Sequence, residues 1–228
     1  SNPTSWSDKA QQCLAHKKYD IVMLAEAHVT AKFLGNAESA VSRWGRQGFF
    51  TQASVSLVNE LHSVGGACIL LKKELFSEPI PDSVLRMAAG GEDIRTLRWT
   101  GCVMRLKGWS ILVIEAYLYT SKTVDGSQLG VKASNMLILQ QLAALMAIYS
   151  LPVVMAADWN MTWDQLEATG WPEQVGLELH DSDRIKFTCT TAHRKIDFFC
   201  ISPDLKPLAG APRADFEVPW GPHALGIT

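Results

Sequence analysis

The sequence lacks the features that mark secreted and membrane-spanning proteins. Its five cysteines are an odd number without a Cys-x-x-Cys pair, which favours buried free thiols in a reducing compartment over a disulfide framework. No apolar run approaches the roughly 18 residues that cross a bilayer. Residues 1–8 also lack the charged and apolar regions of a signal peptide. We therefore expect a soluble intracellular protein, nuclear or cytoplasmic, without a membrane partner.

Charge of either sign is scarce as well. Lysine and arginine total 21 against 23 acidic residues, and 19% of the chain is charged. A low charged content argues against disordered tails. The balance is a weak argument against nonspecific nucleic-acid binding, because phosphate affinity comes mainly from Lys and Arg. It leaves room for a local basic groove around an acidic centre.

Internal repeats, low-complexity tracts and linkers are also absent. With 228 residues and 47% apolar content, the chain is long enough to bury a substantial core. We expect a single domain over residues 1–228, which could be excised from a longer protein. A monomer is the simplest assumption for its oligomeric state.

Short apolar runs rich in β-branched residues and bounded by turn or polar residues predict buried strands. Apolar residues at helical spacing predict helices between them. The expected strands are 21–25, 67–71, 97–107, 110–119, 153–157 and 196–201, and the expected helices are 34–44, 131–149 and 163–169. The pair Lys107-Gly108 predicts a hairpin. Residues 74–92, with two prolines and two glycines, are expected to form an irregular surface excursion. The alternation predicts an α/β fold with mixed sheets.

Two of the expected strands end in polar residues that suit metal chemistry. Glu26 follows the strand 21–25, and Asp158-Trp159-Asn160 follows the strand 153–157. Ligand sites of α/β sheets lie beyond the carboxyl ends of strands. A single strand-end carboxylate is more often simply solvated, but two together favour a site. Oxygen ligands of this kind are what Mg²⁺ prefers.

Asp197 interrupts an otherwise apolar strand. A carboxylate there is costly unless it is paired or lies in a polar site. One interpretation is a buried salt bridge to Arg194 or Lys195, and the other is an Asp that orients a histidine. The candidate histidine is His223, which alone would be an ordinary loop histidine.

Five short segments occur in order along nearly the whole chain: Leu24-Ala25-Glu26, Gly65-Gly66-Ala67-Cys68-Ile69-Leu70, Glu115-Ala116-Tyr117, Ala157-Asp158-Trp159-Asn160 and Lys195-Ile196-Asp197-Phe198. They resemble the Leu-Gln-Glu, Gly-Gly-x-x-Ile, Asn-x-Tyr, Gly-Asp-Phe-Asn and Arg-Ile-Asp-Tyr motifs of the endonuclease/exonuclease/phosphatase superfamily. Each motif is weak singly, but five in order are specific. The departures are Ala25 for the usual Gln and Gly221-Pro222-His223 for Ser-Asp-His at the C-terminus.

The resemblance implies a four-layer α/β sandwich of two packed mixed sheets flanked by helices, with the site at one end. It also implies a divalent-metal-dependent phosphodiester hydrolase, an endonuclease that nicks DNA. By this resemblance Glu26 and Asn2 would hold Mg²⁺ or Mn²⁺, and Asp158 would position or deprotonate the water. Asn160 would hold a phosphate oxygen, and Tyr117 and His223, the latter oriented by Asp197, would donate to the phosphate.

The substrate is less fixed than the chemistry. Arg194 and Lys195 lie just before Asp197 and could contact phosphates, although a solvated basic turn is about as plausible. DNA is preferred over RNA as the partner. The terminal His without its Asp is most similar to endonuclease domains of non-LTR-type retroelements. The alternatives are a phosphatase or phospholipase of the same superfamily, and a degenerate binding module for nucleic acid or protein.

Overall fold

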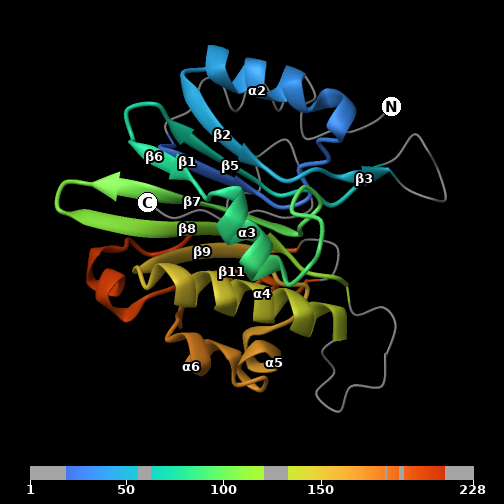
Figure 1. Ribbon diagram of the computed structural model, residues 1–228. Coiled ribbons are helices and arrows are strands. Elements are labelled where there is room, and N and C mark those ends of the chain that lie inside the picture. The colour runs from blue at the N-terminus through green and yellow to red at the C-terminus, as the bar shows by residue number, and fades with distance from the viewer. Residues whose placement is uncertain (1–18, 56–62, 121–132, 183, 190–192, 214–228) are drawn as a thin grey trace.

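Two β-sheets pack face to face in the computed structural model, which describes residues 19–55, 63–120, 133–182, 184–189 and 193–213 (Figure 1). The larger sheet has the strand order β10-β11-β9-β8-β7-β6, and the smaller has the order β1-β5-β2. Their strands are β1 (Ile21–Leu24), β2 (Arg46–Phe50), β5 (Cys68–Lys72), β6 (Ser77–Pro79), β7 (Trp99–Leu106), β8 (Trp109–Tyr117), β9 (Val153–Asp158), β10 (Glu178–His180) and β11 (Asp197–Ile201). A two-stranded sheet, β3 (Ser54–Val55) with β4 (Ser63–Val64), completes the set.

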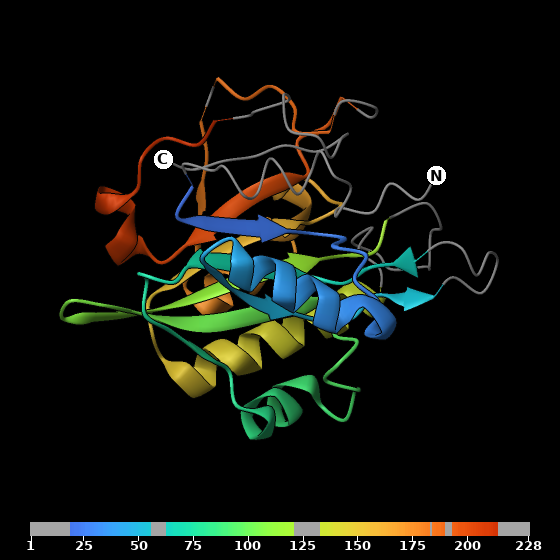
Figure 2. The same ribbon diagram turned by 90° about the horizontal axis from the view of Figure 1, so that it is seen from above.

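Helices cover the outer faces of both sheets. The helix α2 (Leu34–Arg43) lies along the smaller sheet, as Figure 2 shows from above. The helices α3 (Asp82–Ala89), α4 (Ala133–Tyr149), α5 (Trp163–Glu167) and α6 (Trp171–Val175) lie with the larger sheet, and two 3-10 turns, η1 (Ala31–Phe33) and η2 (Pro203–Leu208), connect elements. No helix in the described part of the chain is long and apolar enough to cross a membrane.

The buried side chains form three clusters that follow these layers. One cluster fills the space between the sheets and includes Phe49, Ile69 and Val113. A second lies between the smaller sheet and α2, and the largest lies between the six-stranded sheet and its helices. Alternate residues of a strand point to opposite faces. Odd-numbered residues of β8 therefore face the smaller sheet, and even-numbered residues face α4.

The connection through α4 makes the larger sheet mixed. β8 pairs in parallel with β9, and a parallel neighbour requires a crossover, which α4 supplies. The other strand pairs of this sheet are antiparallel. In the smaller sheet the described strands pair in antiparallel fashion alone, so this part of the chain differs from the expectation of two mixed sheets.

Most of the elements expected from the sequence are present, and the Lys107-Gly108 hairpin joins β7 to β8 with Leu106 opposite Trp109. The expectation for residues 74–92 is wrong, since they form β6 and α3. Pro81 lies at the N-cap of α3, and Gly90 ends it in the left-handed region at φ 62°. Proline and glycine are common in loops, but here Pro81 and Gly90 mark the two ends of a helix.

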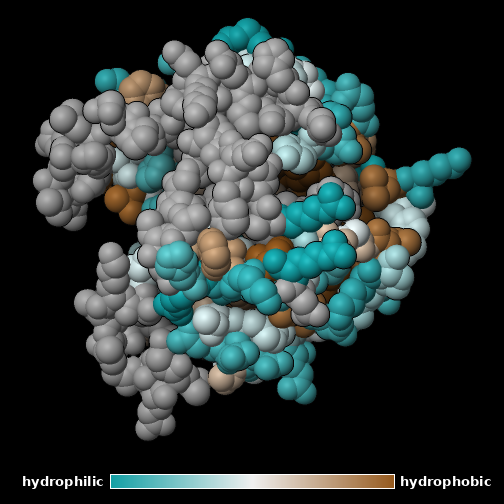
Figure 3. All heavy atoms as spheres, turned by 180° about the vertical axis from the view of Figure 1, so that it is seen from behind, coloured by the Kyte–Doolittle hydropathy of each residue, from teal (hydrophilic) through white to brown (hydrophobic). Residues whose placement is uncertain are grey.

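Some large hydrophobic side chains reach the surface at the β7–β8 turn. In Figure 3, hydrophilic side chains cover much of the described surface on the face seen from behind. Phe76, Leu106 and Trp109, near the β7–β8 turn, are among the exposed large hydrophobic residues. The turn marks the opposite end of β8 from Tyr117.

Candidate active site

A row of polar side chains crosses the six-stranded sheet where β8 and β9 end and β11 begins. Tyr117 is the register partner of Asp158, and Asp158 is the register partner of Asp197. Tyr117 also donates its backbone N–H to the carbonyl of Arg98, at 2.8 Å. Register partners point to the same face of a sheet. Arg98, Tyr117, Asp158 and Asp197 therefore share the face that looks toward the smaller sheet.

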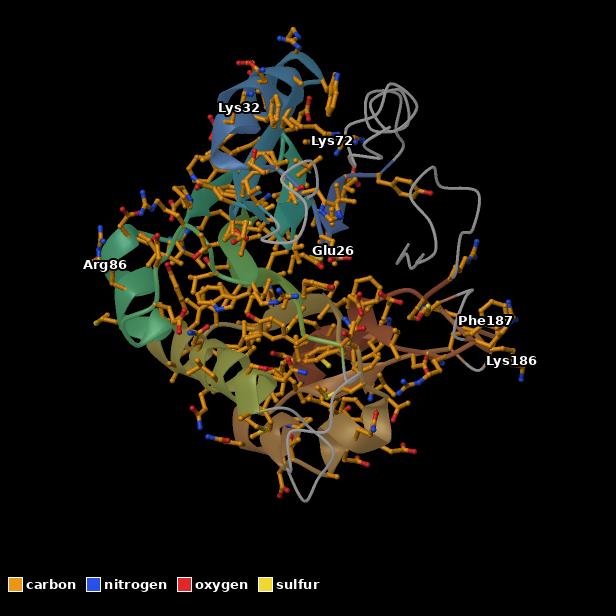
Figure 4. All side chains as sticks on the ribbon, turned by 90° about the vertical axis from the view of Figure 1, so that its right-hand side faces the viewer. Glu26, Lys32, Lys72, Arg86, Lys186 and Phe187 are labelled. Atoms are coloured by element: carbon orange, nitrogen blue, oxygen red, sulfur yellow. The ribbon has the colours of Figure 1, made fainter. Side chains whose placement is uncertain are left out.

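The smaller sheet contributes Glu26 to the same end of the molecule. Glu26 follows β1, and its side chain is hydrogen-bonded to the side chain of Tyr117. The loop is fixed by two backbone bonds, from Ala27 N to Gly66 O at 2.8 Å and from His28 N to Gly65 O at 3.1 Å. Figure 4 looks onto this end and shows Glu26 where the two sheets meet. The structure thus brings Glu26 to the row formed by the larger sheet.

The backbone is strained at three positions around this end. Glu26, His28 and Asn160 have φ values of 50°, 55° and 51°, and they are three of the five described non-glycine residues with positive φ. Such conformations cost free energy in residues with a Cβ. They cluster at functional sites, where the surrounding structure enforces them. The strain is a second observation that points to this end as the site.

The Asp158-Trp159-Asn160 segment holds its two polar side chains in place through a buried tryptophan. Trp159 donates Nε1–H to the carbonyl of Phe198 at 3.0 Å, and the two rings stack with centroids 5.0 Å apart. Asn160 donates its side-chain amide to Leu118 O at 2.8 Å, and its backbone N–H donates to Asp158 Oδ1 at 3.1 Å. The packing of Trp159 therefore fixes the direction of both neighbours.

Thr188 fixes the start of β11 and so the position of Asp197. Its hydroxyl oxygen accepts the N–H groups of Ile196 at 3.1 Å and Asp197 at 2.9 Å. Thr188 is fully buried, and Asp197 is 8% exposed. The carboxylate of Asp197 is thus held on a short rigid segment beside Asp158.

The two basic residues before Asp197 are engaged elsewhere. Lys195 forms an ion pair with Asp181, and Arg194 donates to Gln165 Oε1 at 3.3 Å. The sequence left open a salt bridge from Asp197 to Arg194 or Lys195, and the structure pairs Lys195 with Asp181 instead. Arg194 is exposed, and Lys195 is partly buried.

Two predicted site residues, Asn2 and His223, lie outside the described residues, so their roles stay predictions. The donors that are described suit a hard cation with few protein ligands. Mg²⁺ binds through one or two carboxylates and keeps several waters, and the half-buried carboxylate of Glu26 is a donor of that kind. No group of three or more His, Cys, Asp and Glu side chains within the described ranges could hold a metal ion.

Sequence reasoning did not identify Arg98 as a site residue. Its guanidinium carbon lies 4.1 Å from the ring centroid of Tyr117 and 3.9 Å from that of Tyr119. Its Nε donates to Tyr117 O at 2.9 Å. The sequence could have indicated this position, because a hairpin at Lys107-Gly108 sets an antiparallel register that places Arg98 opposite Tyr117.

Glu115 lies on the same face as the row, two residues before Tyr117, and is 2% exposed. Burial raises the pKa of Glu115 well above 4.5, and the charges of Asp197 and Asp158 raise it further. Burial also raises the pKa of Tyr117, together with the charge of Glu26 and the hydrogen bond to it. The environment of this end of the sheet therefore favours the protonated forms of the Glu115 carboxyl and the Tyr117 phenol.

Solved structures with the same fold come from several groups of phosphate-ester enzymes. The endonuclease domain of TRAS1, a telomere-specific non-LTR retrotransposon, matches with a TM-score of 0.65 and 14% identity over 99% of this chain and 93% of that one. A 3'-5' exonuclease from Neisseria meningitidis matches with a TM-score of 0.62 and 15% identity over 94% and 90%. An AP endonuclease from Archaeoglobus fulgidus matches with a TM-score of 0.60 and 15% identity over the same shares.

The comparisons by sequence add no further relative. No family model matches the chain, and no curated protein matches it. The likeness therefore lies in the fold, which spans nearly the whole chain and is that of the endonuclease/exonuclease/phosphatase structures. At this level of identity the chemistry has to be argued from the site itself.

Proposed function

We propose that this chain hydrolyses phosphodiester bonds with the help of Mg²⁺ or Mn²⁺ and acts as an endonuclease that nicks DNA. The observation that carries the proposal is the convergence of Glu26 from one sheet with Tyr117, Asp158 and Asp197 from the other. Three of these are carboxylates and one is a phenol with a raised pKa. Hydrolysis of a phosphodiester needs this combination of cation binding, water positioning and hydrogen-bond donation.

The proposed roles follow from the position of each side chain. Asp158, at the end of β9, orients the attacking water and accepts its proton. Asn160, held by Leu118 O, presents its amide to a phosphate oxygen. Tyr117 stays protonated and donates to the phosphate as negative charge develops. Asp197 orients His223, which supplies a second donor.

Glu26 would hold the cation, with Asn2 as a further ligand. When bound, the cation supplies positive charge that polarises the phosphate ester. In the free protein the single O–H of Tyr117 donates to the Glu26 carboxylate, and it would turn to the phosphate once the substrate is bound. The remaining geometry would be that of a four-layer α/β sandwich, the arrangement that the five sequence motifs imply.

Basic side chains near this end support nucleic acid as the partner. Lys32 and Lys186 are exposed, and Figure 4 shows them on opposite sides of Glu26. With Arg98 and Arg194 they provide the local positive charge that phosphate binding needs in a chain of near-neutral total charge. DNA is preferred because the TRAS1 match is an endonuclease domain and another match is a 3' phosphatase bound to a product DNA hairpin. The retroelement origin is part of this proposal.

The test is conversion of supercoiled plasmid to nicked circles in Mg²⁺ or Mn²⁺. The wild type is expected to nick, and Glu26→Gln and Asp158→Asn are expected to lose about 100-fold or more in rate. Asp20→Asn is the matched control, because Asp20 precedes β1, is exposed and pairs with the partly buried Lys72. Equal rates for the Glu26 and Asp20 variants would contradict the assignment.

A second set of substrates separates the endonuclease from related activities. The wild type is also incubated with an oligonucleotide that carries a 3'-phosphate and with bis-p-nitrophenyl phosphate. Release of inorganic phosphate without nicking would replace the endonuclease by a phosphatase. If the wild type cleaves none of these esters with either metal, the proposal of an enzyme is wrong, and a binding module remains as the alternative.

A further inference from the structure

Tyr119, two residues beyond Tyr117, is an exposed aromatic ring that the structure holds rigidly. Its backbone N–H donates to Asn135 Oδ1 at 2.8 Å, and its carbonyl accepts the Asn135 side-chain amide at 3.0 Å. Asn135 belongs to α4 and is 3% exposed. A buried amide that makes both bonds to one residue fixes the backbone of that residue. Tyr119 as a whole residue nevertheless remains 40% exposed.

Arg98 fixes the ring as well as the backbone. The guanidinium lies between the rings of Tyr117 and Tyr119, with its carbon 4.1 Å and 3.9 Å from the two centroids. One face of the Tyr119 ring is therefore covered by Arg98, and the exposed part of the ring faces away from it. Stacking of a guanidinium on aromatic faces is favourable when the geometry is held.

The free nitrogens of Arg98 lie beside this ring. Nε is used by Tyr117 O, whereas the two terminal nitrogens donate to no group in the part of the chain that the structure describes. Nη1 is near Gly65, whose ideal Cβ position lies 3.6 Å away. Gly65 in turn bonds the loop of Glu26 through His28. The stack thus adjoins the proposed catalytic row and presents a cation next to an aromatic face.

We propose that Tyr119 is a stacking platform for an unpaired nucleobase next to the cleaved phosphate, with Arg98 contacting the adjoining phosphate. A ring that is fixed on one face and open on the other binds a flat apolar ligand at low entropic cost. Bases stack on such rings in single strands, where their faces are accessible. The inference rests on the proposed function and gives it a substrate class, namely single-stranded or locally unpaired DNA.

The probe is a single-stranded DNA oligonucleotide with one 2-aminopurine, whose fluorescence falls when the base stacks. Its position is moved along the strand, and binding is measured with the Glu26→Gln variant in EDTA so that no cleavage occurs. We expect quenching at one or two positions. Adding Tyr119→Leu should abolish the quenching and weaken binding about 10-fold. Tyr119→Phe, which keeps the ring, should retain both.

Two controls keep the result interpretable. Melting temperatures are measured for all variants, since Asn135 anchors the backbone of Tyr119 and should keep the fold in place. Val55→Leu, at another exposed hydrophobic residue, serves as the matched surface change. A fully paired duplex should show little dependence on Tyr119.

The outcomes separate this inference from the proposed function. If the quenching depends on Tyr119 but the protein cleaves no ester, the stacking role of Tyr119 is supported and the proposed nuclease activity is wrong. If Tyr119→Leu nicks DNA at the normal rate and shows unchanged quenching, Tyr119 is no stacking platform, and the proposed endonuclease activity still stands. An equal loss of duplex and single-strand binding in Tyr119→Leu would also overturn the inference.

Discussion

Tyr117 and Glu26 are joined by a hydrogen bond that crosses from the six-stranded sheet to the three-stranded sheet. One partner ends β8, and the other follows β1 in a left-handed backbone conformation. The bond links the two halves of the proposed site, where the proposed metal ligand meets a proposed donor to the phosphate.

Replacing Tyr117 with Phe removes this bond and leaves the ring. We expect the nicking rate to fall about 10- to 100-fold, because one transition-state donor is lost and Glu26 is no longer oriented. The free energy of unfolding should fall by about 1.5–3 kcal/mol, the usual value of a hydrogen bond to a charged group. Steady-state kinetics and urea denaturation check the two effects. A variant with wild-type kcat would contradict the role.

Chelation should stop the reaction without unfolding the protein. EDTA is expected to abolish nicking, and added Mg²⁺ or Mn²⁺ should restore it, because the cation supplies charge that the side chains do not. Mg²⁺ should also raise the melting temperature of the wild type through binding to the folded state. Glu26→Gln should lose this stabilisation, whereas Asp20→Asn should keep it. Equal stabilisation of both variants would move the metal away from Glu26.

Glu115 should make stability fall with rising pH. Its pKa is raised in the folded state by burial and by Asp197 and Asp158. Below pH 4.5 it is protonated in both states. Above that value the unfolded chain ionises first, so stability is lost as the pH rises toward the folded pKa. Glu115→Gln cannot ionise. Its melting temperature should therefore exceed that of the wild type by about 4 °C or more near pH 8, and the gap should close near pH 5.

The control for this experiment is a carboxyl group on the surface. Glu78 pairs with Arg105 at 2.8 Å, and both side chains are nearly half exposed. Glu78→Gln should show no such growth of the melting-temperature difference with pH. If the two variants behave alike, the effect belongs to total charge and not to the buried site.

Thr188 should matter for both stability and activity. Thr188→Val keeps the shape and removes the acceptor of two backbone N–H groups, which leaves buried donors without their partner. We expect a loss of about 2–4 kcal/mol in the free energy of unfolding. Thr188→Ser should restore most of it. The nicking rate should fall in Thr188→Val and return in Thr188→Ser, because the same segment positions Asp197. A serine variant that is stable but inactive would contradict this account.

The strand-end residues of the site could be predicted because each follows a buried run that is visible in the sequence. Glu26 and Asp158 are of this kind, and the structure places both at one end of the molecule. Asp197 stood out as a carboxylate in an apolar strand, but the resemblance to known motifs was needed to choose between its two interpretations. Tyr117 needed the resemblance altogether, since a tyrosine in a strand has an ordinary structural explanation. Their meeting in one row depends on strand register, which the turn residues and the crossover determine.

What the sequence did not predict depends on tertiary contacts. β2 contains Arg46, which is 3% exposed because its guanidinium donates to the carbonyl of Tyr19 at 2.7 Å, and a buried arginine masks the apolar pattern of a strand. The helix α3 was hidden by the proline and glycine that cap it. The raised pKa of Glu115 follows mainly from its burial, and no local sequence pattern distinguishes a buried glutamate from a solvated one.

The parallel crossover from β8 through α4 to β9 also has a consequence for how the chain folds. Tyr117 and Asp158 are neighbours in space but lie far apart along the chain, and Asp197 and Glu26 join them only after further long-range pairing. Contacts of this range form slowly because chain ends must be brought together first. The site should therefore be among the last parts to assemble, and the return of activity during refolding should lag behind the return of helical signal from α4.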